Sequence, residues 1–271
     1  MNINSFRRNW LKLQKSYEYQ AYKIIQRAFS NMANDINFNS MTPTTYEMYV
    51  ETSVSTEAMQ AAYIELYSTI GIAHGKRMGR IINKDTKNFV ADLFIEEYRT
   101  NLINWIINNA GSRIVSVRAT YVDYIKGIIE QGVKDGKTIV QIAKEIQVMI
   151  KKPNFYRWQA LRIARTETTA AANRGAVQAG ENSRLVYEKV WVSGDDARVR
   201  TRPKSQYDHR EMNGKRVDKD QPFNVNGELI MYAGAPQTVS GAPSHGQNII
   251  NCRCANLIVV KKDSNGRPIR R

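Results

Sequence analysis

The sequence predicts an α+β protein in which a long, mainly helical N-terminal region precedes a small, loop-rich α+β module. Apolar residues recur at three- and four-residue steps through most of the first 179 residues, a pattern typical of amphipathic helices. After Gly180, short β-branched and aromatic runs alternate with segments rich in Gly, Pro, Asn and Asp, which is typical of strands joined by turns. We therefore expect a helical region at 1–134, the module at 135–260 and a basic, disordered tail at 261–271.

Helix boundaries follow from the apolar period and from local signals. The expected helices span residues 4–34, 43–83, 86–109, 112–131, 138–150 and 155–179. Pro43 suits the first turn of a helix, and Gly111 is expected to separate two helices. Thr138 and Gln141 have the three-residue spacing of a capping box, in which each side chain bonds the other residue's backbone N–H. Two strands are expected, at 185–192 and 255–260.

Three glycines lie four residues apart within the second expected helix. Gly71, Gly75 and Gly79 therefore share one helix face, where the missing side chains allow a close approach by another backbone. The alternative is a locally frayed helix, because each interior Gly costs about 1 kcal/mol relative to Ala. We favour a tight helix–helix contact. His74, between two of these glycines, is expected on the helix surface without a role.

The formal net charge of +15 is concentrated in the C-terminal part. Residues 1–150 contain 18 Lys and Arg against 14 Asp and Glu, whereas residues 151–271 contain 22 against 11. A basic surface of this kind attracts polyanions, of which nucleic acids are the commonest, although solubility or an acidic protein partner would explain the charge equally well. The N-terminus has no apolar stretch of membrane-spanning length, so we expect synthesis in a cytoplasm and no membrane partner.

The two cysteines of the chain, Cys252 and Cys254, are separated by one arginine. In a reducing cytosol a close pair is more often a metal or redox element than a disulfide, and a bridge between such near neighbours is strained. His209 and His245 would complete a Cys2His2 set for a structural zinc ion, which would tie the loop around His209 to the last strand. Alternatively, Cys252 packs in the core as a small apolar residue.

Three arginines stand two residues apart, at Arg198, Arg200 and Arg202. On an extended backbone they would share one face and could bind phosphates. The alternative is an internal network with neighbouring acidic residues. The acidic residues of that network would be Asp195, Asp196 and Asp208. Further DNA contacts are expected from the basic residues of the tail, namely Lys261, Lys262, Arg270 and Arg271.

Several spaced motifs, taken in order, resemble the Mu protein F-like family of phage minor head proteins, also called head morphogenesis proteins of the SPP-one type. The residues that carry the resemblance are Gly136-Lys-Thr-Ile-Val-Gln-Ile-Ala143, Ala164-Arg-Thr-Glu167, Asn173, Lys189-Val-Trp191, Asp196, His209, Asn213-Gly214, Phe223, Gly227, Pro236, Pro243 and Asn251-Cys-Arg-Cys254. Asn213 and Ala235 depart from the pattern, because an acidic residue commonly stands at each of these places. The departures argue against chemistry by a carboxylate from either loop.

The resemblance implies a structural protein of a tailed-phage virion, made in the host cytoplasm and associated with the portal vertex. Its implied partners are the portal protein, with the major capsid protein as a further candidate, and double-stranded DNA bound without sequence preference. Within the module we expect a structural network in which Arg165 and Glu167 reach from their helix toward the strands. The other members of this network are Asn173, Trp191, Asp196 and Asn251.

Two other classes of function stay open. An enzyme, such as a nuclease or an ADP-ribosyltransferase, is conceivable because modules of this family can be joined to toxin domains. The chain has no Glu-x-Glu or Gln-x-Glu pair and no His-Asn-His-like cluster, so we assign no catalytic residue. A free DNA-binding protein would need a helix that reads bases, yet no expected helix combines clustered Lys or Arg with exposed Asn or Gln.

Overall fold

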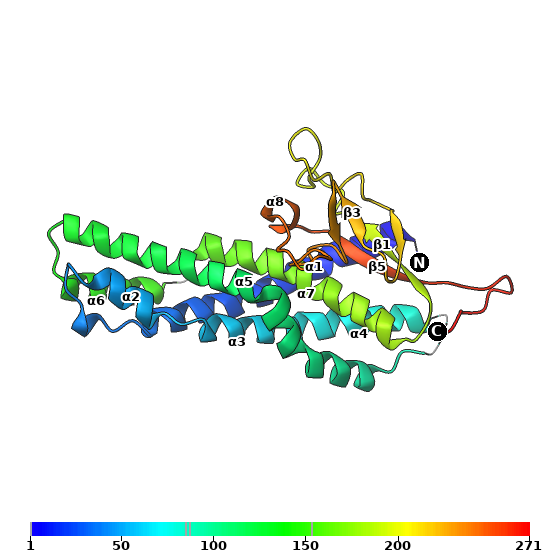
Figure 1. Cartoon of the computed structure of the whole chain (residues 1–271), viewed down its shortest axis with the longest axis horizontal. Helices are drawn as coiled ribbons and strands as arrows, with labels where there is room; N and C mark the ends of the chain where they lie inside the picture. Colours follow the sequence, from blue (N-terminus) through cyan, green and yellow to red (C-terminus); the bar gives the residue numbers. More distant parts are fainter. Residues whose placement is uncertain (1, 85, 87, 153) are drawn as a thin grey trace.

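The computed structural model describes residues 2–84, 86, 88–152 and 154–271 and consists of a long helical bundle with a small sheet region, residues 185–271, at one end (Figure 1). Its helices are α1 (Ile3–Asn34), α2 (Tyr46–Ser53), α3 (Glu57–Leu66), α4 (Ile72–Asn83), α5 (Ala91–Lys134), α6 (Ile139–Ile150), α7 (Arg157–Asn182) and α8 (Gly246–Ile249), with short helical turns η1 (Phe38–Ser40) and η2 (Tyr67–Gly71). The predicted α+β class is confirmed, and the Thr138–Gln141 capping box of α6 is present.

The expected helix at 43–83 is wrong as a single element, because the chain breaks between α2 and α3. Val54 adopts an extended conformation there and is buried at 1% exposure. Its carbonyl oxygen accepts a 2.7 Å hydrogen bond from Nε of Arg118 on α5. A side chain from another helix thus satisfies a backbone group that would otherwise need a helical partner. From α3 the chain continues through the π-helical turn η2 into α4.

The expected helices at 86–109 and 112–131 form one helix, α5, so the predicted break at Gly111 is wrong. A Cβ added at Gly111 would meet no atom within 4 Å, so this residue makes no close contact and simply continues the helix. An interior glycine costs only about 1 kcal/mol, which the packing of a long helix overcomes.

The glycine face of η2 and α4 packs against α7, as predicted. A Cβ at Gly75 would lie 2.9 Å from the carbonyl oxygen of Gly175, and a Cβ at Gly175 would lie 2.0 Å from that of Gly71. The two backbones therefore meet where neither has a side chain. Gly79 instead faces the ring of Phe89.

His74 is buried at 1% exposure, so its expected place on the helix surface is wrong. Its ring meets that of Trp10 edge to face, with centroids 5.0 Å apart. Neither ring nitrogen has a hydrogen-bond partner among the described residues. Burial lowers the pKa of His74 to about 3, so the ring is neutral and packs as an aromatic group between α1 and α4.

Two antiparallel sheets follow the bundle. β1 (Tyr187–Val192) is the central strand between β2 (Arg216–Asp218) and β5 (Ala255–Val260), and β3 (Phe223–Val225) pairs with β4 (Glu228–Ile230). Side chains of β1 alternate: Val190 and Val192 enter the helical core, whereas Trp191 enters a second core above the sheet. That second core also contains Phe223, Cys252 and Cys254.

The tail at 261–271 is ordered in the structure, so the predicted disorder is wrong. The N–H of Val186 donates to the carbonyl of Ile269 at 2.9 Å, and the N–H of Ile269 donates to the carbonyl of Lys261 at 3.0 Å. The chain therefore folds back beside the start of β1, where backbone groups need partners. Arg271 also forms an ion pair with Glu181 of α7 at 2.6 Å.

Candidate functional site

One face of α7 fixes the backbone of the cysteine segment, which we define as residues 251–256. Thr166, Thr169 and Asn173 are spaced three and four residues apart and therefore share that face. Thr166 Oγ1 accepts the N–H of Asn251 at 3.0 Å, and Thr169 Oγ1 donates to the carbonyl of Cys252. Asn173 makes two hydrogen bonds: its Nδ2 donates to the carbonyl of Cys254 at 3.0 Å, and its Oδ1 accepts the N–H of Asn256 at 2.7 Å. Helix side chains thus hold the segment along its length.

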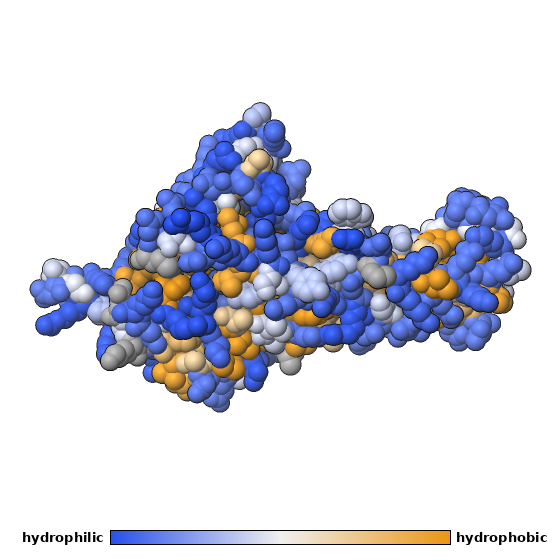
Figure 2. Space-filling model, turned by 180° about the vertical axis from the view of Figure 1, so that it is seen from behind, coloured by the Kyte–Doolittle hydropathy of each residue, from blue (hydrophilic) through white to orange (hydrophobic). Residues whose placement is uncertain are grey.

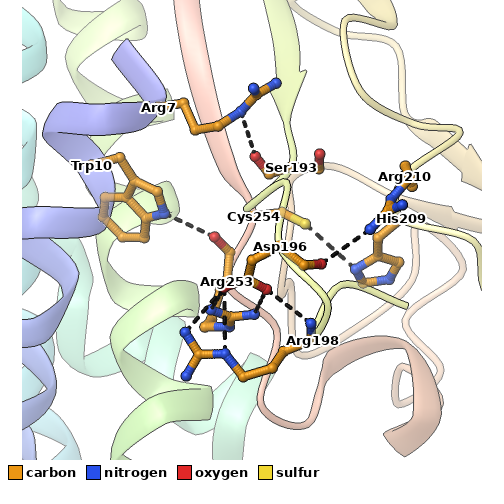
Figure 3. Close-up of polar contacts among 9 residues, drawn as sticks. All are labelled: Arg7, Trp10, Ser193, Asp196, Arg198, His209, Arg210, Arg253 and Cys254. Carbon is orange, nitrogen blue, oxygen red and sulfur yellow. Dashed lines mark hydrogen bonds and ion pairs between the residues drawn. The ribbon is translucent and has the colours of Figure 1, made fainter. Parts of the chain in front are cut away.

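Helix α1 contacts the same segment (Figure 3). The indole N–H of Trp10 donates to the carbonyl of Arg253 at 2.9 Å. One turn earlier, Arg7 donates to the carbonyl of Ser193 at 2.9 Å and pairs with Asp195 at 2.7 Å. Sequence reasoning missed Arg7 and Trp10, because no local signal marks a contact across more than 180 residues.

The side chain of Arg253 forms a two-pronged ion pair with Asp196, one contact of which measures 2.6 Å (Figure 3). Asp196 also pairs with Arg198 at 3.0 Å. The hydrogen bonds from Arg253 are the main reason that the pKa of Asp196 lies well below its ordinary value. Asp196 therefore stays ionised and fixes the loop that follows β1.

The three arginines of the 198–202 run do not form one extended row. Arg198 pairs with Asp196, Arg200 donates to the carbonyl of Ile250, and Arg202 donates to Asn226 Oδ1 at 3.1 Å. Of these side-chain contacts, only the Arg198–Asp196 ion pair belongs to the internal network that we considered as the alternative. Asp208 accepts the backbone N–H groups of Arg202, Arg210 and Glu211, whereas Asp195 pairs with Arg7 of α1.

Cys252, Cys254 and His209 meet in the core above the sheet, with exposures of 1%, 2% and 1%. Nδ1 of His209 lies 3.5 Å from each of the two sulfur atoms. Within the described ranges this is the one group of three or more His, Cys, Asp or Glu residues whose donor atoms all lie within 4.8 Å of one another. Its residue types are ligands of zinc.

His245 is not part of this cluster, so its predicted place as the fourth ligand is wrong. It is exposed, stacks on Tyr207 at a centroid distance of 5.3 Å and begins the short helix α8. Its Nδ1 accepts the backbone N–H of Gln247 at 3.2 Å. Because His245 is the N-cap residue of α8, its ring bonds the start of that helix and does not reach the two cysteines.

A second pair of residues orients His209. Nε2 of His209 lies 2.8 Å from Oδ1 of Asn248, and Nδ2 of Asn248 donates to a carboxylate oxygen of Glu228. Since an ionised carboxylate only accepts, the amide nitrogen must face Glu228 and the amide oxygen must face the histidine. Nε2 therefore carries the proton, and Nδ1 directs its lone pair at the sulfur atoms. The sequence motifs did not point to Asn248 or Glu228.

The two thiols have different acidities. A hydrogen bond from the Cys254 thiol is the main reason that the pKa of Cys252 is lowered, whereas burial raises that of Cys254.

The other predicted members of the network divide between the two cores. Asn173 and Trp191 contact the cysteine segment or the core around it, and Asn251 is the first residue of that segment, bonded to Thr166 of α7. Glu167 does not reach the module as expected: it is 1% exposed, accepts from Tyr67 at 2.9 Å and pairs with Arg113. Arg165 also faces the bundle and lies 3.7 Å from Glu18. Both side chains therefore join helices to one another.

The basic residues of the tail are partly neutralised by acidic neighbours. Lys261 pairs with Asp218 of β2, and Arg271 pairs with Glu181. The side chains of Lys262 and Arg270 are exposed. The tail thus presents fewer uncompensated charges than its sequence indicates.

Residues 123–257 match the model of the family described as "Phage Mu protein F like protein". The chain carries a domain of the phage Mu protein F-like family. Membership of this family supports a role in phage head morphogenesis. The matched span includes α7, the cysteine segment, β1 to β4 and the start of β5, so the cluster of His209, Cys252 and Cys254 lies within the family domain.

The chain is also similar to the curated protein "NAD(+)--arginine ADP-ribosyltransferase EFV" of Enterococcus faecalis (strain ATCC 700802 / V583). The two are 27% identical over 173 residues, which is 62% of this chain but only 32% of the relative. The chain therefore spans about a third of the length of that relative. No solved structure matches the chain. Among the described residues, no helix has the length and apolar composition needed to cross a membrane.

Proposed function

We propose that this protein is a structural minor head protein of a tailed phage, which binds the portal protein and contacts packaged DNA inside the virion. The observation that carries the proposal is the family match over residues 123–257. The side chains that are polar and buried in this span, such as Asn173 and Glu167, hold segments of the chain together, as expected for a structural part. The proposed partners are the portal protein, with the major capsid protein as a further candidate, and DNA.

The end of the bundle that carries α2 and α6 is the proposed surface for the portal protein. It lies far from the sheet region and from both termini (Figure 1). Figure 2 shows apolar side chains at the surface of this end. Val140 and Val148 of α6 are 77% and 53% exposed, and Met48 of α2 is 57% exposed. Exposed apolar residues of this kind favour contact with another protein.

The sheet region supplies the proposed DNA contact. The loop after β1 presents exposed basic residues, namely Arg198, Arg202, Lys204 and Arg210. Although some of these form hydrogen bonds within the loop, their side chains lie at the surface, where phosphates can approach. We expect sequence-independent binding that weakens with added salt.

Co-purification with the portal protein of the same phage tests the structural role. Wild-type protein should be retained by immobilised portal protein and should be present in assembled particles. The double variant Val140→Asp, Val148→Asp should lose retention while its thermal unfolding is unchanged, because both positions are exposed. Val239→Asp, at a position 49% exposed in the sheet region, is the matched control and should bind normally. Absence of wild-type protein from both portal complexes and particles would contradict the proposal.

The name of the Enterococcus relative favours one second candidate, transfer of ADP-ribose from NAD⁺ to arginine. About two thirds of that relative lies outside the match, and this chain has no Glu-x-Glu or Gln-x-Glu pair. Incubation of the purified chain with labelled NAD⁺ and an arginine-rich protein distinguishes the two candidates. We expect no transfer of label; transfer that requires this chain would establish the enzyme instead.

A further inference from the structure

We propose that His209, Cys252 and Cys254 bind one Zn²⁺ ion, with a fourth position left for a water molecule. The inference is independent of the role in head assembly proposed above, because it rests on the geometry of three buried side chains. Both sulfur atoms lie 3.5 Å from the same nitrogen, Nδ1 of His209. This convergence is the first argument for a metal.

A single imidazole nitrogen has one lone pair and cannot accept good hydrogen bonds from two thiols at once. A metal ion between the three atoms removes this conflict, because each atom then donates its own lone pair to the metal. For tetrahedral zinc, with Zn–S near 2.3 Å and Zn–N of about 2.0–2.1 Å, the nitrogen and each sulfur are separated by about 3.5 Å. The observed separations agree with this value.

The surroundings of His209 prepare it as a ligand. Glu228 fixes the amide of Asn248, and Oδ1 of Asn248 in turn accepts a hydrogen bond from Nε2–H of His209, so the lone pair of the neutral ring is on Nδ1. Metal-binding histidines typically donate their second ring N–H to an oxygen of this kind. Asn248 is 1% exposed, so the arrangement is shielded from water.

The sulfur atoms are also held in place before any metal binds. The carbonyl groups of Cys252 and Cys254 are bonded to Thr169 and Asn173 of α7. The indole N–H of Trp191, in the same buried core as the two cysteines, has no hydrogen-bond acceptor among the described residues. A metal-bound thiolate beside it would be stabilised by this N–H group.

The donor set selects the metal and leaves one position open. Two thiolates and an imidazole favour zinc over Mg²⁺ or Ca²⁺, which prefer oxygen ligands. No fourth His, Cys, Asp or Glu joins the group within the part of the chain that the structure describes. A small cavity, lined in part by Gly194 and Arg200, lies beside His209 and Cys254 and gives space for a water molecule.

Metal analysis of the full chain, purified under reducing conditions, is the direct test. We expect about one zinc ion per chain and, after exchange, thiolate-to-cobalt charge-transfer absorption with Co²⁺. Chelation should lower the unfolding temperature, because the metal joins the loop around His209 to the segment before β5. Folded, reduced protein that neither contains zinc nor takes up Co²⁺ would overturn the proposal, as would a metal-free protein with a Cys252–Cys254 disulfide.

Variants separate binding at this site from binding elsewhere. Cys252→Ser and Cys254→Ser should lose the zinc and the cobalt–thiolate absorption, and chelator should no longer change their unfolding temperature. Asn248→Asp keeps an acceptor for His209 but loses the donor to Glu228, so we expect zinc affinity to fall 10- to 100-fold. His245→Asn preserves the start of α8 and is the matched control, with unchanged zinc content. Zinc retained in full by both serine variants would contradict the assignment even if those variants were folded.

Discussion

Asn173 joins α7 to two separate segments of the sheet region. Its amide nitrogen donates to the carbonyls of Ala233 and Cys254 at 2.8 and 3.0 Å, and its amide oxygen accepts the N–H of Asn256 at 2.7 Å. The residue is fully buried. An amide is therefore needed here, because it supplies two N–H donors and an acceptor together, whereas a carboxylate only accepts and a hydroxyl group has a single donor.

Replacing Asn173 by Ala should lower the free energy of unfolding by about 2–4 kcal/mol, because three buried backbone groups lose their partner. The measurement is urea unfolding followed by circular dichroism. Asn182→Ala, at the end of the same helix, is the control, since its bond to Glu97 is exposed and its loss should cost less than about 0.5 kcal/mol. Equal losses in the two variants would show that Asn173 has no special part in holding the cysteine segment.

Lys189 is buried on β1, where its ammonium group donates to the carbonyl of Met231 at 3.0 Å. Burial lowers its pKa from 10.5 to about 8. The unfolded chain therefore binds this proton over a pH range in which the folded chain releases it, so stability rises with pH between about 8 and 10.5.

We expect Lys189→Met to remove this part of the pH dependence. Unfolding free energies of both proteins, measured in urea at several pH values across that window, should converge as the pH rises. Each pH unit of the window corresponds to about 1.4 kcal/mol at most. A constant difference between wild type and variant would mean that Lys189 stays protonated or is screened by water.

Single residues also show which side-chain contacts the sequence could predict and which it could not. The pair Cys252 and Cys254 with His209 was predicted as one group, because cysteine spacing is a local signal. The inclusion of His245 was wrong, and Asn248 and Glu228 were missed, because the sequence does not show which side chains a loop directs inward. His74 and Glu167 are likewise buried by helices that are distant in sequence.

At the scale of elements, the spacing of glycines along a helix predicted packing correctly where those glycines contact another helix. The glycine spacing at Gly71 and Gly75 predicted a close helix contact, and the structure shows Gly175 opposite it. Gly111 was predicted to separate two helices, but it lies inside α5 and has no atom near its missing side chain. A glycine that permits contact and one that merely interrupts a pattern are therefore indistinguishable without the partner helix. The break at Val54 had no local signal, because Arg118 of another helix supports it.

Two glycine substitutions test this difference directly. Gly175→Ala should destabilise the protein by about 2 kcal/mol or more, since its new methyl group would lie 2.0 Å from the carbonyl oxygen of Gly71 and the helices must separate. Gly111→Ala, in open space on α5, should stabilise it by about 0.5–1 kcal/mol through helix propensity. Thermal and urea unfolding measure both. The same sign of effect for the two variants would contradict the proposed helix contact.

At the scale of the whole molecule, the fold class and the basic character of the C-terminal part were readable from composition and periodicity. The attachment of α1 to the sheet region was not, because Trp10 and Arg253 are 243 residues apart. Order in the tail was also missed, since its charged composition is typical of disorder while its pairing with Val186 depends on the finished sheet.

The charge distribution gives the last prediction, which concerns DNA. The chain should bind random double-stranded DNA at low salt, and the logarithm of its affinity should fall linearly with the logarithm of salt concentration. Arg202→Glu with Lys204→Glu, both exposed in the loop after β1, should weaken binding and reduce the slope by about 1 for each phosphate that the loop no longer binds. Arg157→Glu, an exposed arginine at the start of α7 in the bundle, changes the charge without touching this loop and should retain the slope. Fluorescence anisotropy at several salt concentrations provides both quantities. A change of slope in the bundle variant about half as large as in the loop variant, in proportion to its one charge reversal against two, would mean that net charge alone, rather than this loop, attracts the DNA.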